Sequence, residues 1–263
     1  MDFAQFITNL NPWALFGLVV AFCVLTAEAG ALVAQFLIRR GKKDPETPVG
    51  TAVGALLGLL AFMLGFTFSF TASRFADRKA LTISQSNAIG TSYLRTSILP
   101  EKQKQEIRKY YREYVNILVQ DLTSEQEVRT ALKKMSKLHI LIWSQTATLA
   151  KEDMDSELRS LFTASVNTVI DIAGERKTVG LVFRIPSVIW ISLFLLAGLG
   201  MFSIGYQTGT HGSRRVMDLP VLAAAFALVI VMIANMDSSG VHRFKVSLQP
   251  YKDLQEMMQE EIP

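Results

Sequence analysis

The chain has 263 residues, a formal net charge of +4 and a single cysteine, and half of its residues are hydrophobic. The modest charge is dispersed over the segments between apolar blocks, so it does not by itself indicate nucleic-acid binding. The single cysteine, Cys23, lies inside an apolar block, which excludes an intrachain disulfide and a zinc cluster of cysteines.

Apolar residues are concentrated in four blocks, at residues 12–38, 50–73, 185–206 and 219–236. Each block approaches or exceeds the roughly 20 residues that a helix needs to cross the hydrocarbon of a bilayer. The first block is too long for a signal peptide, and no lysine or arginine precedes it. We therefore predict an all-α integral membrane protein with four transmembrane helices that contact the lipid bilayer.

The long segment between the second and third blocks has a helical pattern throughout. Apolar residues recur every three or four positions in residues 101–122, Ser124 and Glu127 match a capping box, and a further helix is predicted over residues 155–183. We expect transmembrane helices 1 and 2 with a basic connecting loop (1–73), a soluble helical bundle continuous with helices 2 and 3 (74–184), transmembrane helices 3 and 4 (185–236), and an amphipathic C-terminal tail that docks on the bundle (237–263).

The second apolar block carries two stripes of side chains. Phe62, Phe66 and Phe70 stand at i, i+4 and i+8 and form a bulky stripe, a quarter turn or more from a stripe of small residues. Small residues at this spacing let a neighbouring helix backbone approach closely. We expect this helix to pack by its small stripe and to line a pore with its phenylalanines, although such phenylalanines can equally face lipid. The glycines of the small stripe are Gly50, Gly54, Gly58 and Gly65.

Four charged residues follow the phenylalanine stripe: Arg74, Asp77, Arg78 and Lys79. Three of them are cationic, and beside a pore they would raise the local concentration of anions by electrostatic focusing. The simpler interpretation is that they anchor the helix at the membrane surface. Asp77 complicates the prediction of selectivity because it can pair with Arg74 or Arg78.

Two acidic residues lie in or at the end of apolar blocks. Glu28 is inside the first block, where an ionisable group is costly unless it faces protein or water. It is either a functional group or a glutamate buried between helices beside Ala27, Ala29 and Gly30. Together with Asp237, at the end of the fourth block, it suggests a minor hypothesis of proton or cation movement.

The distribution of charged residues at the ends of the apolar blocks does not determine on which side of the membrane the bundle lies. Four spans place both termini and the bundle on one side and the two short loops on the other. Cations are enriched in short cytoplasmic loops, so the short loops favour a bundle outside the cell. The cations that flank the bundle side cancel this count. The short loops carry Arg39, Arg40, Lys42, Lys43, Arg214 and Arg215; the bundle side carries Arg74, Arg78, Lys79, Arg176, Lys177, Arg184, Arg243 and Lys245.

Three stretches of the sequence resemble the bestrophin-like family of uncharacterised bacterial membrane proteins. They are GLLAFMLGFTFSFTASRFADRKAL in the second block, SNAIGTSYLRTSILP at residues 86–100, and Asp237 followed by SLQP at residues 247–250. This family is distantly similar to bestrophins, which are pentameric anion channels with four membrane helices per subunit and a cytosolic helical region between spans two and three. The resemblance implies a homo-oligomer, with a pentamer favoured, in a bacterial inner membrane with the bundle in the cytoplasm.

The resemblance also gives the phenylalanine stripe a role. In bestrophins a narrow neck is formed by three bulky apolar residues at i, i+4 and i+8 of the second helix, and Phe62, Phe66 and Phe70 match that spacing. The acidic cluster of the calcium clasp of animal bestrophins has no counterpart here. Calcium gating is therefore not implied.

The sequence indicates no enzyme, cofactor or metal site. His139, His211 and His242 are scattered, and no P-loop or nucleophile elbow occurs. The first hypothesis is an oligomeric bestrophin-like channel that conducts inorganic ions, with chloride or another anion favoured, through a hydrophobic neck that gates by dewetting. The alternative is a non-conducting membrane sensor or scaffold whose helical bundle binds a ligand or a protein partner. The charged short loops support the alternative, but the chain lacks an evident output domain.

Overall fold

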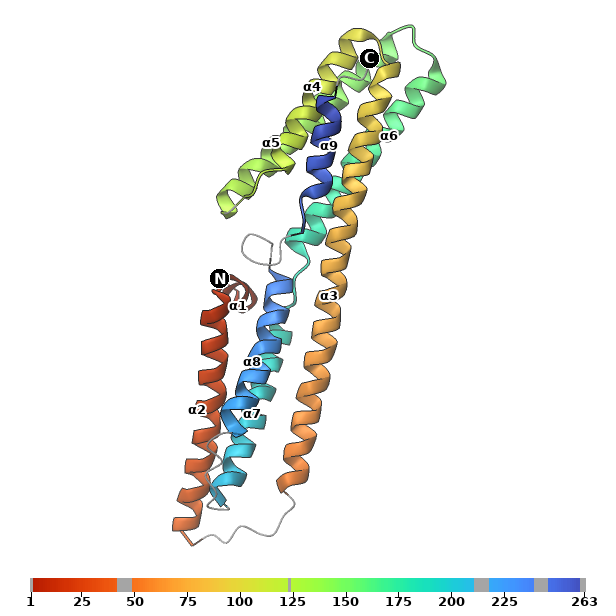
Figure 1. Cartoon of the computed structure of the whole chain (residues 1–263). Coiled ribbons are helices and arrows are strands. Elements are labelled where there is room, and N and C mark those ends of the chain that lie inside the picture. Colours follow the sequence, from red (N-terminus) through yellow and green to blue (C-terminus); the bar gives the residue numbers. More distant parts are fainter. Residues whose placement is uncertain (1, 42–48, 123, 211–217, 239–245, 261–263) are drawn as a thin grey trace. The chain divides into compact units, whose positions relative to one another are not determined.

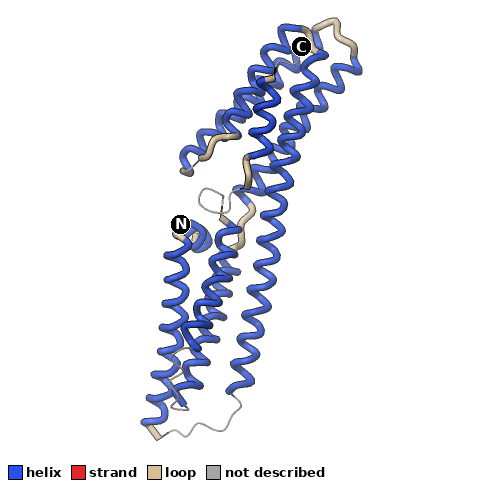
Figure 2. Tube along the Cα trace, in the orientation of Figure 1, coloured by secondary structure: helices blue, strands red, loops and turns tan. Residues whose placement is uncertain are grey.

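The computed structural model describes residues 2–41, 49–122, 124–210, 218–238 and 246–260. These residues form helices and short connections, without a strand among them (Figure 2). In chain order (Figure 1) the elements are α1 (Phe3–Asn9), α2 (Pro12–Arg39), α3 (Val49–Arg95), η1 (Thr96–Ile98), α4 (Glu101–Leu118), α5 (Glu125–Thr148), η2 (Leu149–Lys151), α6 (Ser156–Lys177), η3 (Thr178–Val182), α7 (Ser187–Thr210), α8 (Asp218–Asp237) and α9 (Gln249–Gln259).

Within the described residues, four helical segments are long and apolar enough to cross a membrane. They are α2, the first half of α3, α7 and α8, in the same order as the four apolar blocks of the sequence. The prediction of an all-α membrane protein with four transmembrane helices is confirmed.

The chain divides into two compact units. The first, here called the membrane unit, comprises Met1–Phe75 and Arg184–Ser238; the second, the bundle unit, comprises Ala76–Phe183 and Ser239–Pro263. Helix α3 contributes to both units without a break in its helical backbone. On the other side of the bundle the helical backbone ends at Val182, and Phe183–Pro186 are not helical before α7 begins.

The membrane unit is built on a close contact between α2 and α7 of the same chain. A Cβ atom added to Gly205 would collide with the backbone of Ala27, and one added to Gly30 would collide with the backbone of Phe202. Small residues allow this approach, as expected for helices that associate in lipid by van der Waals packing. The core around the contact includes Trp190 and Met201 of α7, both fully buried.

Among the described residues, the glycine stripe of α3 has no such partner. A Cβ at Gly54, Gly58 or Gly65 would meet no atom within 4 Å, and one at Gly50 would meet only the side chain of Gln207 at 3.4 Å. Helix α3 instead contributes another face to its own unit. The buried residues of that face, at intervals of three, four or seven residues, are Val53, Leu60, Leu64, Thr67 and Thr71. Packing of the glycine stripe against a second copy stays a prediction.

The bundle unit has its own apolar core. Helix α4 contributes the buried side chains of Ile107, Tyr111 and Tyr114, and Phe162 of α6 packs in the same cluster. The capping box before α5 is confirmed, because the Ser124 hydroxyl accepts from the Glu127 N–H at 3.2 Å and the Ser124 N–H donates to the Glu127 carboxylate at 3.2 Å.

The C-terminal tail docks on the bundle as predicted. Helix α9 buries Tyr251, Leu254 and Met258 in the bundle core. The Ser86 hydroxyl of α3 donates to the carbonyl oxygen of Pro250 at 2.7 Å. Helix α9 is therefore fixed both by its apolar face and by a hydrogen bond at its first turn.

We expect Gly205→Ala to destabilise the membrane unit, because the added methyl group collides with the backbone of Ala27 and not with a side chain that can rotate away. Overpacking of this kind costs about 1–3 kcal/mol. The measurement is thermal unfolding of the detergent-solubilised protein by circular dichroism. The control is Gly17→Ala on α2, where the added Cβ meets no atom within 4 Å. Equal melting temperatures for the two variants would contradict the close contact.

Candidate functional site

The three phenylalanines of the phenylalanine stripe, Phe62, Phe66 and Phe70, point away from the core of their own unit, whereas Phe68 of the same helix packs against it. Their side chains are 67% (Phe62), 61% (Phe66) and 39% (Phe70) exposed. On the buried face of the same helix, Leu60 and Leu64 are at most 5% exposed. The phenyl rings are therefore available to lipid, to another copy of the chain or to a pore.

Helix α3 has three faces at membrane depth. Because each residue advances a helix by about 100°, the glycine stripe (Gly58, Gly65) lies about a quarter turn from the phenylalanine stripe, and each lies somewhat more than a third of a turn from the buried face (Leu60, Leu64). One face contacts the helix's own unit, and the other two are open in the single chain. The glycine stripe is therefore free to pack against a second protein surface, and the phenylalanine stripe is free to face lipid or a pore.

The charged residues that follow the phenylalanines do not form one group. The Arg74 guanidinium lies 4.2 Å from the centre of the Phe70 ring, which is a cation–π distance. Arg78 is half-buried and lines a cavity of the bundle unit, whereas Asp77 and Lys79 are exposed. Within the described part of the chain Asp77 forms no ion pair, so the pairing with Arg74 or Arg78 considered from the sequence is not formed.

Glu28 is not buried between helices of its own chain. Its side chain is exposed on α2, while the neighbouring Ala27 and Gly30 are buried in the contact with α7. The interpretation that Glu28 lies between helices beside these small residues is therefore wrong for the single chain. Where the two backbones come closest, at Gly30 and Gly205, there is no room for a long side chain. The side chain at position 28 points to another face of the helix.

Asp237 is buried and connects the end of α8 to the start of α7. Its carboxylate oxygens accept from the Ile185 N–H at 3.1 and 3.3 Å, and its carbonyl oxygen accepts from the Arg184 guanidinium at 2.8 Å. A carboxylate that accepts a backbone N–H stabilises an otherwise unpaired donor at the entry to α7. This arrangement gives Asp237 a structural role.

A buried polar network that the sequence analysis missed lies in the bundle unit, centred on Gln85 of α3. The Gln85 side-chain oxygen accepts from Tyr251 Oη at 2.7 Å and from Arg176 Nη1 at 3.2 Å, and its nitrogen donates to Tyr114 Oη at 2.8 Å. Arg176 also stacks on the Tyr251 ring, 5.3 Å from its centre. Burial raises the pKa of Tyr114 and the pKa of Tyr251 above their usual values, so both phenols remain protonated.

A second polar group lies nearby in sequence on the same helix. Ser92 hydrogen-bonds to the Tyr111 hydroxyl at 2.7 Å and accepts from the Ser165 hydroxyl at 3.0 Å. Burial raises the pKa of Tyr111 above its usual value, which keeps its hydroxyl protonated. Both groups join α3 to α4 and α6 by side chains far apart in the sequence, which explains why no local pattern revealed them.

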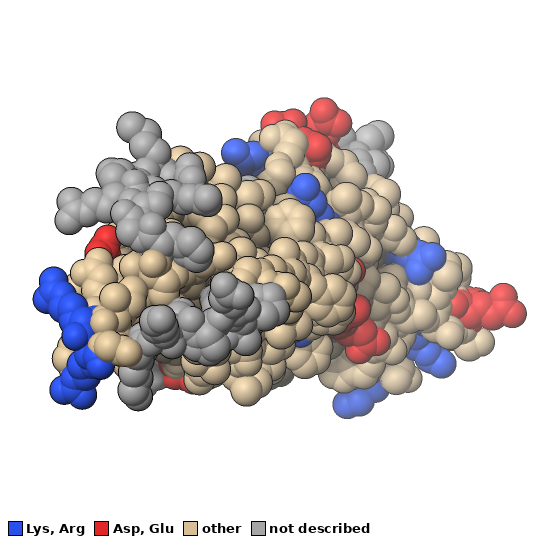
Figure 3. All heavy atoms as spheres, turned by 90° about the horizontal axis from the view of Figure 1, so that it is seen from below, with Lys and Arg blue, Asp and Glu red and all other residues tan. Residues whose placement is uncertain are grey.

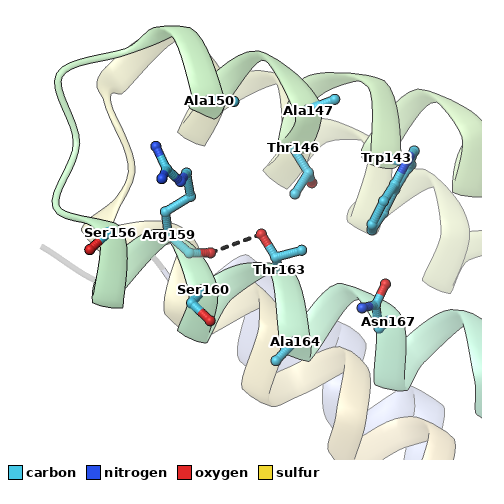
Figure 4. A pocket seen from close by; sticks show the side chains of 10 residues that line it. All are labelled: Trp143, Thr146, Ala147, Ala150, Ser156, Arg159, Ser160, Thr163, Ala164 and Asn167. Atoms are coloured by element: carbon cyan, nitrogen blue, oxygen red, sulfur yellow. Dashed lines mark hydrogen bonds between the residues drawn. The ribbon is translucent and has the colours of Figure 1, made fainter.

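An open groove runs between α5 and α6 (Figure 4). Its volume is about 420 Å³, and Figure 4 shows side chains from both helices facing it. The drawn hydrogen bond, from the Thr163 hydroxyl to the Arg159 carbonyl oxygen at 2.8 Å, lies within α6. Small side chains such as Ala147 and Ala164 leave the groove wide, and it contains no buried charged group.

The described residues contain no cluster of three or more histidine, cysteine, aspartate or glutamate side chains that could hold a metal ion. His139 is half-buried and packs on the Tyr114 ring, with the ring centres 4.9 Å apart. Viewed from below (Figure 3), a group of Lys and Arg side chains lies at the left edge of the molecule. Arg39 and Arg40, at the end of α2, are exposed. The remaining histidines and loop cations of the orientation argument lie outside the described residues; they are Lys42, Lys43, His211, Arg214, Arg215, His242, Arg243 and Lys245.

Solved structures share this architecture. A crystal structure of a bacterial Bestrophin homolog from Klebsiella pneumoniae matches with a TM-score of 0.66 at 14% identity, covering 94% of this chain and 99% of that chain. A variant of that homolog with a substituted tryptophan gives a TM-score of 0.69 at 13% identity, covering 95% and 97%. A variant with a substituted leucine gives a TM-score of 0.68 at 13% identity, covering 94% of this chain and 99% of that chain. The fold is that of a bestrophin-like, four-helix membrane protein.

A family model described as Bestrophin-like domain matches residues 15–250. The chain belongs to the bestrophin-like family, as its sequence stretches predicted. No match was found among curated proteins.

We expect Gln85→Met to destabilise the bundle unit by about 1–3 kcal/mol, because the Tyr251 hydroxyl and the Arg176 guanidinium lose a buried acceptor. The measurement is the melting temperature of the detergent-solubilised protein. Asn87→Met, two positions further along α3 at an exposed site, is the matched control. If both variants melt at the wild-type temperature, the network does not stabilise the bundle.

Proposed function

We propose that this protein is an oligomeric ion channel in which α3 lines the pore and Phe62, Phe66 and Phe70 form a hydrophobic neck. The observation that carries this proposal is the exposure of all three phenyl side chains on a helix whose opposite face is buried in its own unit. The bestrophin fold supports it, because the bestrophins that this family resembles are anion channels. We also propose a bacterial plasma-membrane location, with the bundle on the cytoplasmic side.

The three faces of α3 fit a helix in a closed ring. In a ring of copies each lining helix needs one face for its own subunit, one for a neighbouring copy and one for the axis. The buried face serves the first need, the glycine stripe suits a close-packed neighbour, and the phenylalanine stripe is left for the axis. A pentamer is the assembly favoured by the family resemblance.

A neck of phenyl rings controls conduction by excluding water. An ion that enters an apolar constriction loses hydration without gaining replacement ligands, so a narrow ring of phenylalanines is a barrier until it widens. Arg74, which stacks on Phe70, brings a positive charge to the last ring of the neck and favours anions by electrostatic focusing. Chloride and similar inorganic anions are therefore the proposed permeant ions.

We expect Phe66→Ala to increase the current of the reconstituted protein by about tenfold or more, the change produced by lowering the barrier by about 1.4 kcal/mol. The measurement is ion current in planar bilayers with symmetrical chloride. The matched control is Leu195→Ala, which truncates a similarly exposed apolar side chain on α7 and leaves α3 unchanged. An equal current for Phe66→Ala and wild type would remove Phe66 from the pore. The absence of current from all three proteins would favour a sensor or scaffold.

A further inference from the structure

The bundle unit contains a cavity that the channel proposal does not use. Its volume is about 450 Å³, and its walls come from α3, α4, α5, α6 and the residues just before α9. Pockets that bind small molecules have volumes of roughly 300–1,000 Å³. The cavity is therefore large enough for a small organic ligand.

The lining of the cavity carries more positive than negative charge. Arg78, Arg176 and Lys177 line it, and Asp121 is the one carboxylate among the described lining residues. Within the described residues Arg176 forms no ion pair; its recorded partners are the neutral Gln85 amide and the Tyr251 ring. A partly buried guanidinium with only neutral partners is incompletely compensated, since desolvated charges are normally paired.

The hydrogen bonds around Arg176 leave donors unused. A guanidinium only donates, so the Gln85 atom beside it is the amide oxygen, and the amide nitrogen then faces Tyr114. The Tyr114 hydroxyl accepts that bond, and its own proton has no acceptor among the described residues. A buried nitrogen of His139, on the ring that packs against Tyr114, also lacks a hydrogen-bond partner among these residues. The Arg176 guanidinium and the Tyr114 hydroxyl therefore both have hydrogen-bond donors that the described residues leave unused.

Apolar side chains line much of the rest of the cavity, beside the polar Thr82, Gln120 and Ser136. Ile117 and Leu118 of α4, Leu132 and Met135 of α5, and Ile170 of α6 line it. Ligand pockets combine such a surface with a few polar groups that fix the ligand's orientation. A fully hydrated ion such as free chloride would leave the apolar wall without a partner.

We infer that this cavity binds a small organic carboxylate with an apolar body, with the carboxylate at Arg176 and Tyr114 and the body against the wall of Ile117, Leu132 and Ile170. A planar guanidinium holds a carboxylate by two parallel hydrogen bonds, and the Tyr114 proton supplies a third. The inference concerns the bundle unit alone and goes beyond the proposed conduction, so it stands whether or not the protein carries current.

The first test is calorimetric titration of the purified full-length protein in nanodiscs with octanoate, octanamide and acetate. Octanoate has both the charge and the apolar body, octanamide lacks the charge, and acetate lacks the body. We expect octanoate to bind roughly tenfold or more tightly than either of the others, because each lacks one of the two recognised features. Equal binding of octanoate and octanamide, or no binding of octanoate, would overturn the inference.

Two variants locate the site. Arg176→Gln should weaken octanoate binding by roughly 10- to 100-fold, as expected for loss of a charge-assisted hydrogen bond. Ala173→Phe, which fills the cavity from α6, should abolish binding, whereas Ala164→Phe on the same helix, in the open groove of Figure 4, should leave binding unchanged. Melting temperatures show which variants fold, and if Arg176→Gln does not, Ala173→Phe carries the test. Unchanged affinity in a folded Arg176→Gln or Ala173→Phe protein would place octanoate elsewhere.

Discussion

The division of α3 into three faces is the constraint on which the rest of the account depends. A membrane helix of a single chain has no need for two open stripes of different character, since lipid accepts any apolar surface. Here one face is buried by Leu60 and Leu64, one is lined by glycines, and one presents Phe62, Phe66 and Phe70. This pattern is satisfied when a second copy covers the glycines and the phenylalanines meet around an axis.

The membrane unit shows how small residues are used where their partner is visible. Gly30 and Gly205 let α2 and α7 approach until an added Cβ would collide with backbone, and this contact lies within one chain. Glycine spacing in the sequence predicted a close approach for the small stripe of α3, and this stays a prediction. It did not distinguish a partner in the same chain from one in another copy, because both make the same demand on side-chain size. For the same reason the small residues around Glu28 indicated a buried contact but not the direction of the glutamate itself.

Features set by local sequence were predicted well. The four spans follow from the lengths of the apolar blocks, and the capping box at Ser124 and the amphipathic C-terminal tail follow from short patterns. The network around Gln85 was not predicted, because Tyr114 and Tyr251 lie 29 and 166 positions from Gln85 in the sequence and reach it only by tertiary packing. The cavity beside this network is a product of the same packing. The unused hydrogen-bond donors of Arg176 and Tyr114 make ligand binding in the bundle a proposal that is separate from ion conduction.

The most direct measurement of the central claim is the symmetry of the purified assembly by electron cryomicroscopy, at a resolution that shows side chains of α3. The account predicts a closed ring in which the side chains of Phe62, Phe66 and Phe70 face the symmetry axis and Gly58 and Gly65 lie against a neighbouring copy. A monomer, or a ring whose phenylalanines face the surrounding lipid, would contradict it.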